Sequence, residues 1–261
     1  MLEAERFYDA LAGDYHLLFA DWWPAARWHG EVIAGVLAAR GVTPPATVLD
    51  CTCGIGTQAL PLAAVGYRVV ATDVSAEAVR RARVEAAARG LTLDLRVADV
   101  RRLRPAVDGV FDAVISCDNA LPHLLTDDDL ASAARGIRDC LRDDGVLVAS
   151  IRDYDALRLD RPPGTPITLH GSPGRRAGAV QSWAWSPDGE FVDVSLFLLQ
   201  ESASGWRVSA HETRYRALRR DVLVSVLRAS GFGSVDWLEP EDSGYYQPIV
   251  VATANRAVSG R

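Results

Sequence analysis

The stretch TVLDCTCGIGT, residues 47–57, decides the fold. It begins with a short run of β-branched and aliphatic residues, passes through two closely spaced glycines, and leads into an alanine- and leucine-rich segment that predicts a helix. Glycines at such a turn let the backbone bend sharply and approach a ligand at the N-terminus of the helix. A strand, a glycine loop and a helix in this order predict the first unit of a parallel α/β sheet.

The same alternation continues downstream and sets the fold class. Strands are predicted at RVVATD, LTLDLRV, FDAVISC and GVLVASI, with helices over Ala76 to Arg89 and from about Asp127 to Leu141. A helix from about Arg219 to Ser230, the strand SVDWL and the strand QPIVVATA follow. Short buried strands alternating with helices predict a doubly wound, Rossmann-like α/β sheet that is covered on both faces.

One segment departs from this alternation. Between Asp155 and Arg216 the sequence alternates with period two and carries turn residues at SPDG and SASG, which predicts two successive antiparallel hairpins. We therefore divide the chain into a core over 1–154, an inserted antiparallel β flap over 155–216 and a completion of the core over 217–261. An insertion after the fifth strand is expected to lie over the edge where such sheets bind ligands.

Composition narrows the class of protein. The chain has 261 residues, 49% of them hydrophobic, so it can bury a substantial core without disulfides or metals. Its net charge of −6 comes from interspersed acids and bases, which argues against a nucleic-acid partner. No secretory signal and no apolar run of spanning length is visible, so we expect a cytoplasmic protein with no membrane partner.

The four cysteines form no spaced framework. Cys51, Cys53, Cys117 and Cys140 lie in or beside apolar runs, and we expect reduced, mostly buried thiols. Cys51 and Cys53 make a C-x-C with no second pair to complete a zinc site. We therefore predict no bound metal.

Three acids close three consecutive predicted strands. Asp73 can accept hydrogen bonds from both ribose hydroxyls of an adenosine, and Asp99 can accept one from an adenine amino group. The alternative is that Asp50, Asp73 and Asp99 are helix caps and turn residues. A dinucleotide fold is the main competitor, but no third glycine completes G-x-G-x-x-G, and Asp50 suits an ammonium group better than a pyrophosphate. Together the acids predict an adenosyl site.

With these residues the chain resembles the class I S-adenosylmethionine-dependent methyltransferases, and among them the glycine/sarcosine N-methyltransferases and their bacterial relatives. The resemblance rests on LDCTCGIGTQ, ATDVS, ADV, CDNALPHLL, IRDYD, ETRYR and GYYQPIVVA, which occur in the family's order over nearly the whole chain. The common class I loop has a glycine where Thr52 stands, and small replacements there occur in this group. The resemblance implies S-adenosylmethionine as cofactor and S-adenosylhomocysteine as product.

The resemblance also implies which residues hold the cofactor. The N-terminal segment is expected to form a lid, with its aromatics over the adenosine or the sulfonium cation and Arg27 at the methionine carboxylate. The alternative is an amphipathic helix whose aromatics are core. The expected cofactor contacts are Tyr8, Tyr15, Trp22, Arg27, Asp50, Cys51, Gly54, Gly56, Asp73, Val74, Asp99, Val100, Cys117 and His123.

A second set of residues is expected at the acceptor. Asn119 can accept a hydrogen bond from an amine, and Asp118 and His123 are candidates for taking its proton. In the family an arginine at the position of Arg152 binds a carboxylate, which a guanidinium can grip at two points. Arg152 is alternatively an ion-pair partner of Asp153 or Asp155. The expected substrate contacts are Asn119, Arg152, Tyr154, Tyr215 and Tyr245, with Tyr246 as an alternative to Tyr245.

The expected reaction is direct methyl transfer from sulfonium to nitrogen, for which the protein mainly aligns atoms and excludes water. The first hypothesis is an N-methyltransferase for a small amine, such as the amino acids glycine or sarcosine. An alternative is O- or N-methylation of a specialised metabolite beneath a larger apolar lid, and a third is an adenosyl-binding protein without turnover. Homo-oligomerisation is left open.

Overall fold

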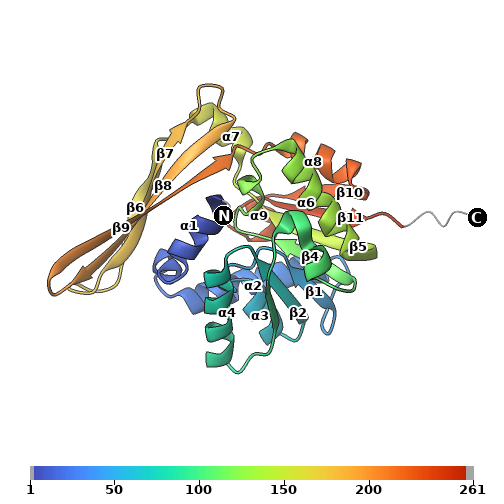
Figure 1. Cartoon of the computed structure of the whole chain (residues 1–261), viewed down its shortest axis with the longest axis horizontal. Coiled ribbons are helices and arrows are strands. Elements are labelled where there is room, and N and C mark those ends of the chain that lie inside the picture. The colour runs from blue at the N-terminus through green and yellow to red at the C-terminus, as the bar shows by residue number, and fades with distance from the viewer. Residues whose placement is uncertain (1–2, 257–261) are drawn as a thin grey trace, which may run out of the picture.

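A seven-stranded sheet forms the core of the protein (Figure 1). The computed structural model describes residues 3–256. The strand order is β10-β11-β5-β4-β1-β2-β3, in which β11 runs antiparallel to β5 and the strands from β5 to β3 are parallel. The strands are β1 (Thr47–Asp50), β2 (Arg68–Asp73), β3 (Asp94–Val97), β4 (Phe111–Ser116), β5 (Leu141–Ser150), β10 (Phe232–Leu238) and β11 (Ile249–Ala254).

Helices cover both faces of this sheet because each presents one apolar stripe to it. One face carries α2 (Trp22–Ala38), α3 (Ala59–Ala64) and α4 (Ala76–Ala88). The other carries α5 (Leu103–Ala106), α6 (Asp127–Asp139) and α8 (Arg220–Ala229). Every residue of the central strand β4 is buried, as expected where helices pack on both sides. The doubly wound prediction is confirmed.

The remaining helical elements are short and surround the carboxyl edge of the sheet or its loops. They are α1 (Glu3–Leu11), η1 (Tyr15–Leu18), η2 (Val100–Arg102), η3 (Leu121–His123), α7 (Tyr154–Asp160) and α9 (Pro240–Ser243). The sequence did not predict α7, which the side chain of Asp153 caps by accepting from the Ala156 N–H at 3.1 Å. The antiparallel sheet consequently begins nine residues after Asp155, at Gly164.

The second sheet is antiparallel with the order β6-β7-β8-β9, and we call it the flap. Its strands are β6 (Gly164–His170), β7 (Ala177–Trp185), β8 (Phe191–Ser202) and β9 (Gly205–Arg216). The alternation along β8 buries Val192, Val194, Leu196 and Leu198 on one face. Helix α1 lies between flap and core, where its Phe7 packs in one cluster with Leu196 and Leu198 (Figure 1). The predicted antiparallel insertion is confirmed.

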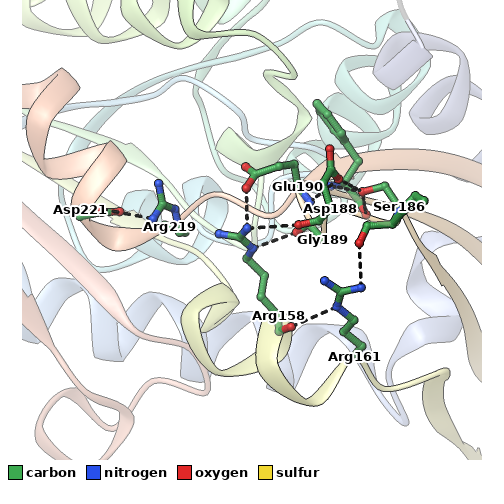
Figure 2. A network of polar contacts seen from close by, with 10 residues as sticks. Arg158, Arg161, Ser186, Asp188, Gly189, Glu190, Arg219 and Asp221 are labelled. Atoms are coloured by element: carbon green, nitrogen blue, oxygen red, sulfur yellow. Dashed lines mark hydrogen bonds and ion pairs between the residues drawn. The ribbon is translucent and has the colours of Figure 1, made fainter.

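The flap is tied to the core at one end by α7 (Figure 2). Arg158 donates to the Gly189 carbonyl at 2.9 Å and forms an ion pair with Glu190, both in the turn between β7 and β8. Arg161 donates to the Pro187 carbonyl in the same turn at 3.1 Å. These contacts fix the β7–β8 turn against the segment that follows β5.

Between residues 3 and 256, no helix has both the length and the apolar character needed to cross a membrane. The same part of the chain holds no group of three or more His, Cys, Asp and Glu side chains arranged to bind a metal ion.

Candidate functional site

Two adjoining cavities open at the carboxyl ends of the parallel strands. The first, of about 310 Å³, is lined by the loops after β1, β2, β3 and β4 and by α1. The second, of about 540 Å³, lies between that edge and the flap. Among the described residues, Tyr8, Tyr15 and Asp118 line both cavities. The two spaces therefore meet at these three side chains.

Asp73 shapes the first cavity from the end of β2. Its Oδ2 accepts from the Gly54 N–H at 2.8 Å and its Oδ1 accepts from the Ser75 N–H at 2.9 Å. Burial raises the pKa of Asp73, although these two backbone hydrogen bonds act in the opposite direction. Because a carboxylate oxygen can accept more than one hydrogen bond, Asp73 can still receive a pair of hydroxyls from the cavity.

Asp50 lies beneath the glycine loop and does not line either cavity. Its Oδ1 accepts from the Thr52 N–H at 3.3 Å, whereas Oδ2 is buried and has no hydrogen-bond partner within residues 3–256. Burial, reinforced by the negative charges of Asp73 and Asp118, raises the pKa of Asp50 to about 8. Asp50 therefore stabilises the loop through its hydrogen bond with Thr52, and other residues form the surface of the first cavity.

The glycines of this loop have different surroundings. Gly54 has φ +53° and lines the first cavity, with open space where a Cβ would project. Gly56 has φ +97° and does not line it, and a Cβ there would lie 2.7 Å from Leu60 Cγ. Both φ values lie in the region that favours glycine. Gly56 thus permits the close packing of loop on helix, while Gly54 leaves room for a ligand.

Asp99 lines the first cavity and is held by Arg101, an arginine that the sequence did not single out. Arg101 Nη2 lies 2.6 Å from Asp99 Oδ2, and Arg101 Nη1 reaches Asp129 Oδ1 at 2.8 Å. Burial would raise the pKa of Asp99, but the bonds from Arg101 outweigh it and the pKa is lowered. Asp99 therefore presents an oriented, ionised carboxylate.

Two N-terminal residues expected at the cofactor, Trp22 and Arg27, line neither cavity. Trp22 is buried and donates from Nε1 to Thr57 Oγ1 at 3.2 Å, while Arg27 is exposed on α2, and neither lines a cavity. The buried face of α2 includes Trp22, Ala26, His29 and Ile33, and Arg27 falls outside that stripe. The expected cofactor residues that do line the first cavity are Tyr8, Tyr15, Cys51, Gly54, Asp73, Val74, Asp99, Val100, Cys117 and His123.

A strained dipeptide after β4 joins the two cavities. Asp118 and Asn119 have φ values of 59° and 67°, and their N–H groups donate to Ser150 Oγ at 2.8 Å and to the Ser150 carbonyl at 3.1 Å. Asn119 Oδ1 accepts from the Arg152 N–H at 3.0 Å and its Nδ2 donates to the Tyr154 hydroxyl at 3.0 Å. The amide oxygen that we expected to face an acceptor amine accepts from the Arg152 backbone and keeps one further lone pair.

Asp118 is surrounded by donors. It accepts from Gln58 Nε2 at 2.7 Å, from the Tyr246 hydroxyl at 2.9 Å and from the Tyr245 hydroxyl. Burial would raise the pKa of Asp118, but His29, Tyr245 and Gln58 outweigh it and the net pKa is lowered. The carboxylate is thus anionic and held in one orientation at the junction of the cavities.

His123 is neutral in this environment. Its Nε2 hydrogen-bonds with the Tyr8 hydroxyl at 3.1 Å, and its Nδ1 lies 3.4 Å from Thr213 Oγ1. Burial, with the positive charge of Arg152 nearby, lowers the pKa of His123 to about 3. Such an imidazole has little tendency to take up a proton near neutral pH, so its geometry favours a role in orienting Tyr8.

Arg152 points into the second cavity from the segment after β5. Its guanidinium carbon lies 4.8 Å from the Trp183 ring centroid and 5.3 Å from that of Tyr215, and Nη2 donates to Gln181 Oε1 at 3.2 Å. Nη1 is buried and lacks a hydrogen-bond partner among residues 3–256.

Arg152 was alternatively expected to form an ion pair with Asp153 or Asp155, but these two aspartates pair with another arginine. Asp153 and Asp155 lie 3.2 and 4.0 Å from Arg220 nitrogens instead. Of the other residues expected at the acceptor, Tyr215 lines the second cavity with Arg152 and Asn119, while Tyr154 and Tyr245 are buried behind its wall. The neighbouring Tyr246 takes the cavity position.

Several side chains of the site were missed by the sequence analysis, namely His29, Gln58, Arg101, Gln181 and Trp183. His29 is the one that a pattern could have indicated, because it lies seven residues after Trp22 on the same buried helical face. Gln181 and Trp183 come from a strand whose pairing brings them over Arg152, which no local pattern specifies.

Known sequences match the core of this chain over part of its length. Residues 48–145 match the family described as "Methyltransferase domain". A glycine/sarcosine N-methyltransferase from Halorhodospira halochloris is 31% identical over 153 residues, which are 59% of this chain and 56% of that protein. One from Parasynechococcus marenigrum is 32% identical over 137 residues, 52% of this chain and 48% of that protein. The chain thus spans about half the length of the curated relatives it matches.

Solved structures share the fold over most of the chain. An S-adenosylmethionine-dependent methyltransferase from Clostridium acetobutylicum superposes with a TM-score of 0.75 at 16% identity, covering 96% of this chain and 99% of that one. An amino pentose methyltransferase from Micromonospora echinaspora superposes with a TM-score of 0.70 at 21% identity, covering 87% and 92%. At such identities the likeness establishes the fold alone.

Proposed function

We infer that this chain, which belongs to the class I S-adenosylmethionine-dependent methyltransferases, transfers a methyl group to the nitrogen of a small amine that carries a carboxylate. The observation that carries the inference is Arg152. Its guanidinium lines the second cavity, and within residues 3–256 no carboxylate forms an ion pair with it. A partly buried guanidinium without a counter-ion costs free energy, and a substrate carboxylate would supply one.

The first cavity fits the cofactor. Asp73 has acceptor capacity left for ribose hydroxyls, and Gly54 leaves open space beside it. Tyr8 and Tyr15 lie where the cavities meet, and aromatic faces there suit a sulfonium cation. When bound, S-adenosylmethionine supplies a methyl group that its positive sulfur has already activated. The residues of this chain then need to hold, orient and shield the reacting atoms.

The second cavity has opposite charges in its wall. Arg152 offers a guanidinium, and Asp118 offers an anionic carboxylate at the junction with the first cavity. An amine with a carboxylate matches this polarity if its carboxylate lies at Arg152 and its nitrogen at the junction. The nitrogen would then lie on the side from which the methyl group comes, which is the alignment that in-line transfer requires.

A second candidate is methylation of a larger specialised metabolite. The observation that favours it is the volume of the second cavity, about 540 Å³ against about 310 Å³ for the first. Pockets for drug-sized ligands begin at roughly 300 Å³. The amino pentose enzyme of similar fold acts, by its name, on an acceptor larger than glycine.

A panel assay separates the two. The purified protein is incubated with radiolabelled S-adenosylmethionine and with glycine, sarcosine, larger amino acids, and an amino sugar that lacks a carboxylate. Transfer confined to the carboxylate-bearing amines supports the first proposal, and the preferred length among them reports how much of the cavity is filled. Transfer to the amino sugar alone favours the second candidate.

Arg152 gives the sharper test. Arg152→Ala should raise KM for the preferred carboxylate acceptor at least tenfold, with a loss of about 2–4 kcal/mol, because it leaves a carboxylate unpaired in the cavity. Arg152→Lys should also be impaired, since an ammonium cannot reproduce a planar two-point grip.

The control is Arg175→Ala, which removes an exposed arginine from the turn between β6 and β7. S-adenosylhomocysteine affinity should be unchanged in both Arg152 variants, because Arg152 does not line the first cavity. Unchanged acceptor kinetics in Arg152→Ala would remove the anchor of the proposal, as would a loss confined to cofactor binding.

A further inference from the structure

His29 of α2 lies in the wall of the second cavity beside Asp118. His29 is 5% exposed, and its Nδ1 lies 3.6 Å from Asp118 Oδ2 and 3.3 Å from the Tyr245 hydroxyl oxygen. Gln58 Nε2 lies 3.2 Å from the same nitrogen and donates to Asp118 Oδ2 at 2.7 Å. The Nδ1 edge of the imidazole therefore faces Asp118 and the two side chains that donate to it, Gln58 and Tyr245.

The other edge of the imidazole is left for the cavity. Within the part of the chain that the structure describes, Nε2 of His29 takes part in no hydrogen bond, yet it is not one of the sealed polar atoms that lack a partner. Because Nδ1 is taken up by its contacts with Asp118, Tyr245 and Gln58, Nε2 is the nitrogen left to meet a molecule in the second cavity, which His29 lines. The two N–H groups of Gln58 can go to Asp118 and to the Tyr245 oxygen, and the Tyr245 hydroxyl gives its own proton to Asp118. A proton on Nδ1 can then be donated to the Tyr245 oxygen beside the anion, which leaves a lone pair on Nε2.

We propose that His29 removes the proton from the acceptor amine before methyl transfer, with Asp118 fixing the orientation and tautomer of its ring. This rests on the proposed function, since it concerns the same acceptor cavity. The ammonium form of the acceptor gives its proton to His29 Nε2 and becomes a neutral amine. The nitrogen lone pair then forms the new N–C bond as the S–C bond breaks, and that bonding pair stays on sulfur.

The other ionisable groups of the cavities are less suited to this step. The pKa of His123 is lowered to about 3 by burial, so it does not hold a proton near neutral pH. Burial raises the pKa values of Tyr8, Tyr15 and Tyr246, so their hydroxyls keep their protons. The lowered pKa of Asp118 makes it a weak base. An imidazole is the side chain that exchanges a proton most readily near neutral pH.

Within residues 3–256, one anion lies next to His29. Asp118 faces it from the loop after β4. The neutral groups around it come from its own helix, from the residue that follows η1, from the residue that precedes α3 and from the loop before β11. Those neutral neighbours are Phe19, Trp28, Gln58, Tyr245 and Tyr246. Arg152 is the cation that lines the same cavity.

The test is the pH profile of His29→Gln, which keeps a polar side chain but cannot accept a proton from an amine. With the acceptor identified by the panel assay, kcat/KM at neutral pH should fall on the order of 10²–10³-fold. The defect should shrink as pH rises, because more of the acceptor arrives already neutral. S-adenosylhomocysteine affinity should stay within about threefold by calorimetry, and the control His170→Gln, on β6, should match the wild type.

A defect of the same size at every pH would overturn the proposal, because a purely structural histidine would give that result. If His29→Gln does not fold, the wild type decides by itself with two acceptors of different amine pKa. The same inflection in kcat for both acceptors supports an ionising group of the protein, whereas an inflection that follows the acceptor overturns it. A wild type that binds S-adenosylhomocysteine but methylates no amine of the panel would instead overturn the proposed function.

Discussion

Replacing Asp50 by asparagine should remove a pH dependence from the stability of the fold. Asp50 is 1% exposed beneath the glycine loop, with one oxygen 3.3 Å from the Thr52 N–H and the other unpartnered within the described chain. Burial, together with the charges of Asp73 and Asp118, raises its pKa to about 8. Asparagine has nearly the same shape as the protonated acid and cannot ionise.

The sign and size follow from linkage. Between the pKa of the unfolded chain, 3.8, and that of the folded state, the folded protein keeps a proton that the unfolded chain has released. The stabilisation is complete below about pH 4 and is lost as pH rises toward 8, by about 1.4 kcal/mol per pH unit at most. Between pH 4 and pH 7 the loss amounts to about 4 kcal/mol. Asp50→Asn should therefore gain on the wild type as pH rises.

Urea unfolding between pH 4.5 and 8.5 measures this, with the difference between variant and wild type as the readout. Taking the difference cancels other groups, such as His123, whose lowered pKa makes stability fall as pH drops from 6.5 toward 3. The matched control is Asp108→Asn, which changes a side chain that is 90% exposed. A difference for Asp50→Asn that stays constant across the range would refute the assignment of a buried, protonated carboxyl.

Two further predictions concern the first cavity. Asp73→Ala should weaken S-adenosylhomocysteine binding by about 2 kcal/mol, roughly thirtyfold in Kd by calorimetry, and should also lower Tm because the Gly54 and Ser75 N–H groups lose their acceptor. An unchanged Kd would remove Asp73 from the ribose. Gly54→Ala should cost about 1–2 kcal/mol of unfolding free energy, and Gly56→Ala more, since its Cβ would lie 2.7 Å from Leu60 Cγ. Equal costs in urea unfolding would contradict the packing argument.

The sheet and the first cavity could be predicted because local signals agree with the global arrangement. Strands β1, β2, β4 and β5 contain apolar runs that end in an acidic or small residue, and Asp99 follows β3 by two residues. The order of elements therefore indicates which acids meet at the carboxyl edge. Asp73 and Asp99 line the first cavity for this reason. The side chains that pair with these acids, such as Arg101 with Asp99, depend on rotamers. The sequence pattern does not specify those rotamers.

In the N-terminal segment the sequence did not indicate which side chains face the cavities. Arg27 and His29 are two residues apart on α2, and an arginine is the usual expectation at a carboxylate. The phase of the helix decides otherwise, because the stripe that contains Trp22 and Ile33 turns His29 inward and leaves Arg27 exposed. Tyr245 and Tyr246 pose the same problem, since adjacent residues of a loop point to different sides and only the loop's conformation selects one.

The dipeptide after β4 explains how one short loop can serve both cavities. Asp118 and Asn119 both adopt positive φ, which costs most side chains free energy but which Asp and Asn tolerate better than other residues. Ser150 at the end of the neighbouring strand accepts both of their N–H groups and so holds the strained backbone. In this backbone conformation Asp118 lies at the junction of the cavities beside His29, while Asn119 accepts from the Arg152 N–H. The anion and the cation that would bind the two ends of an acceptor are therefore positioned by adjacent residues, so a substitution in this turn should disturb both together.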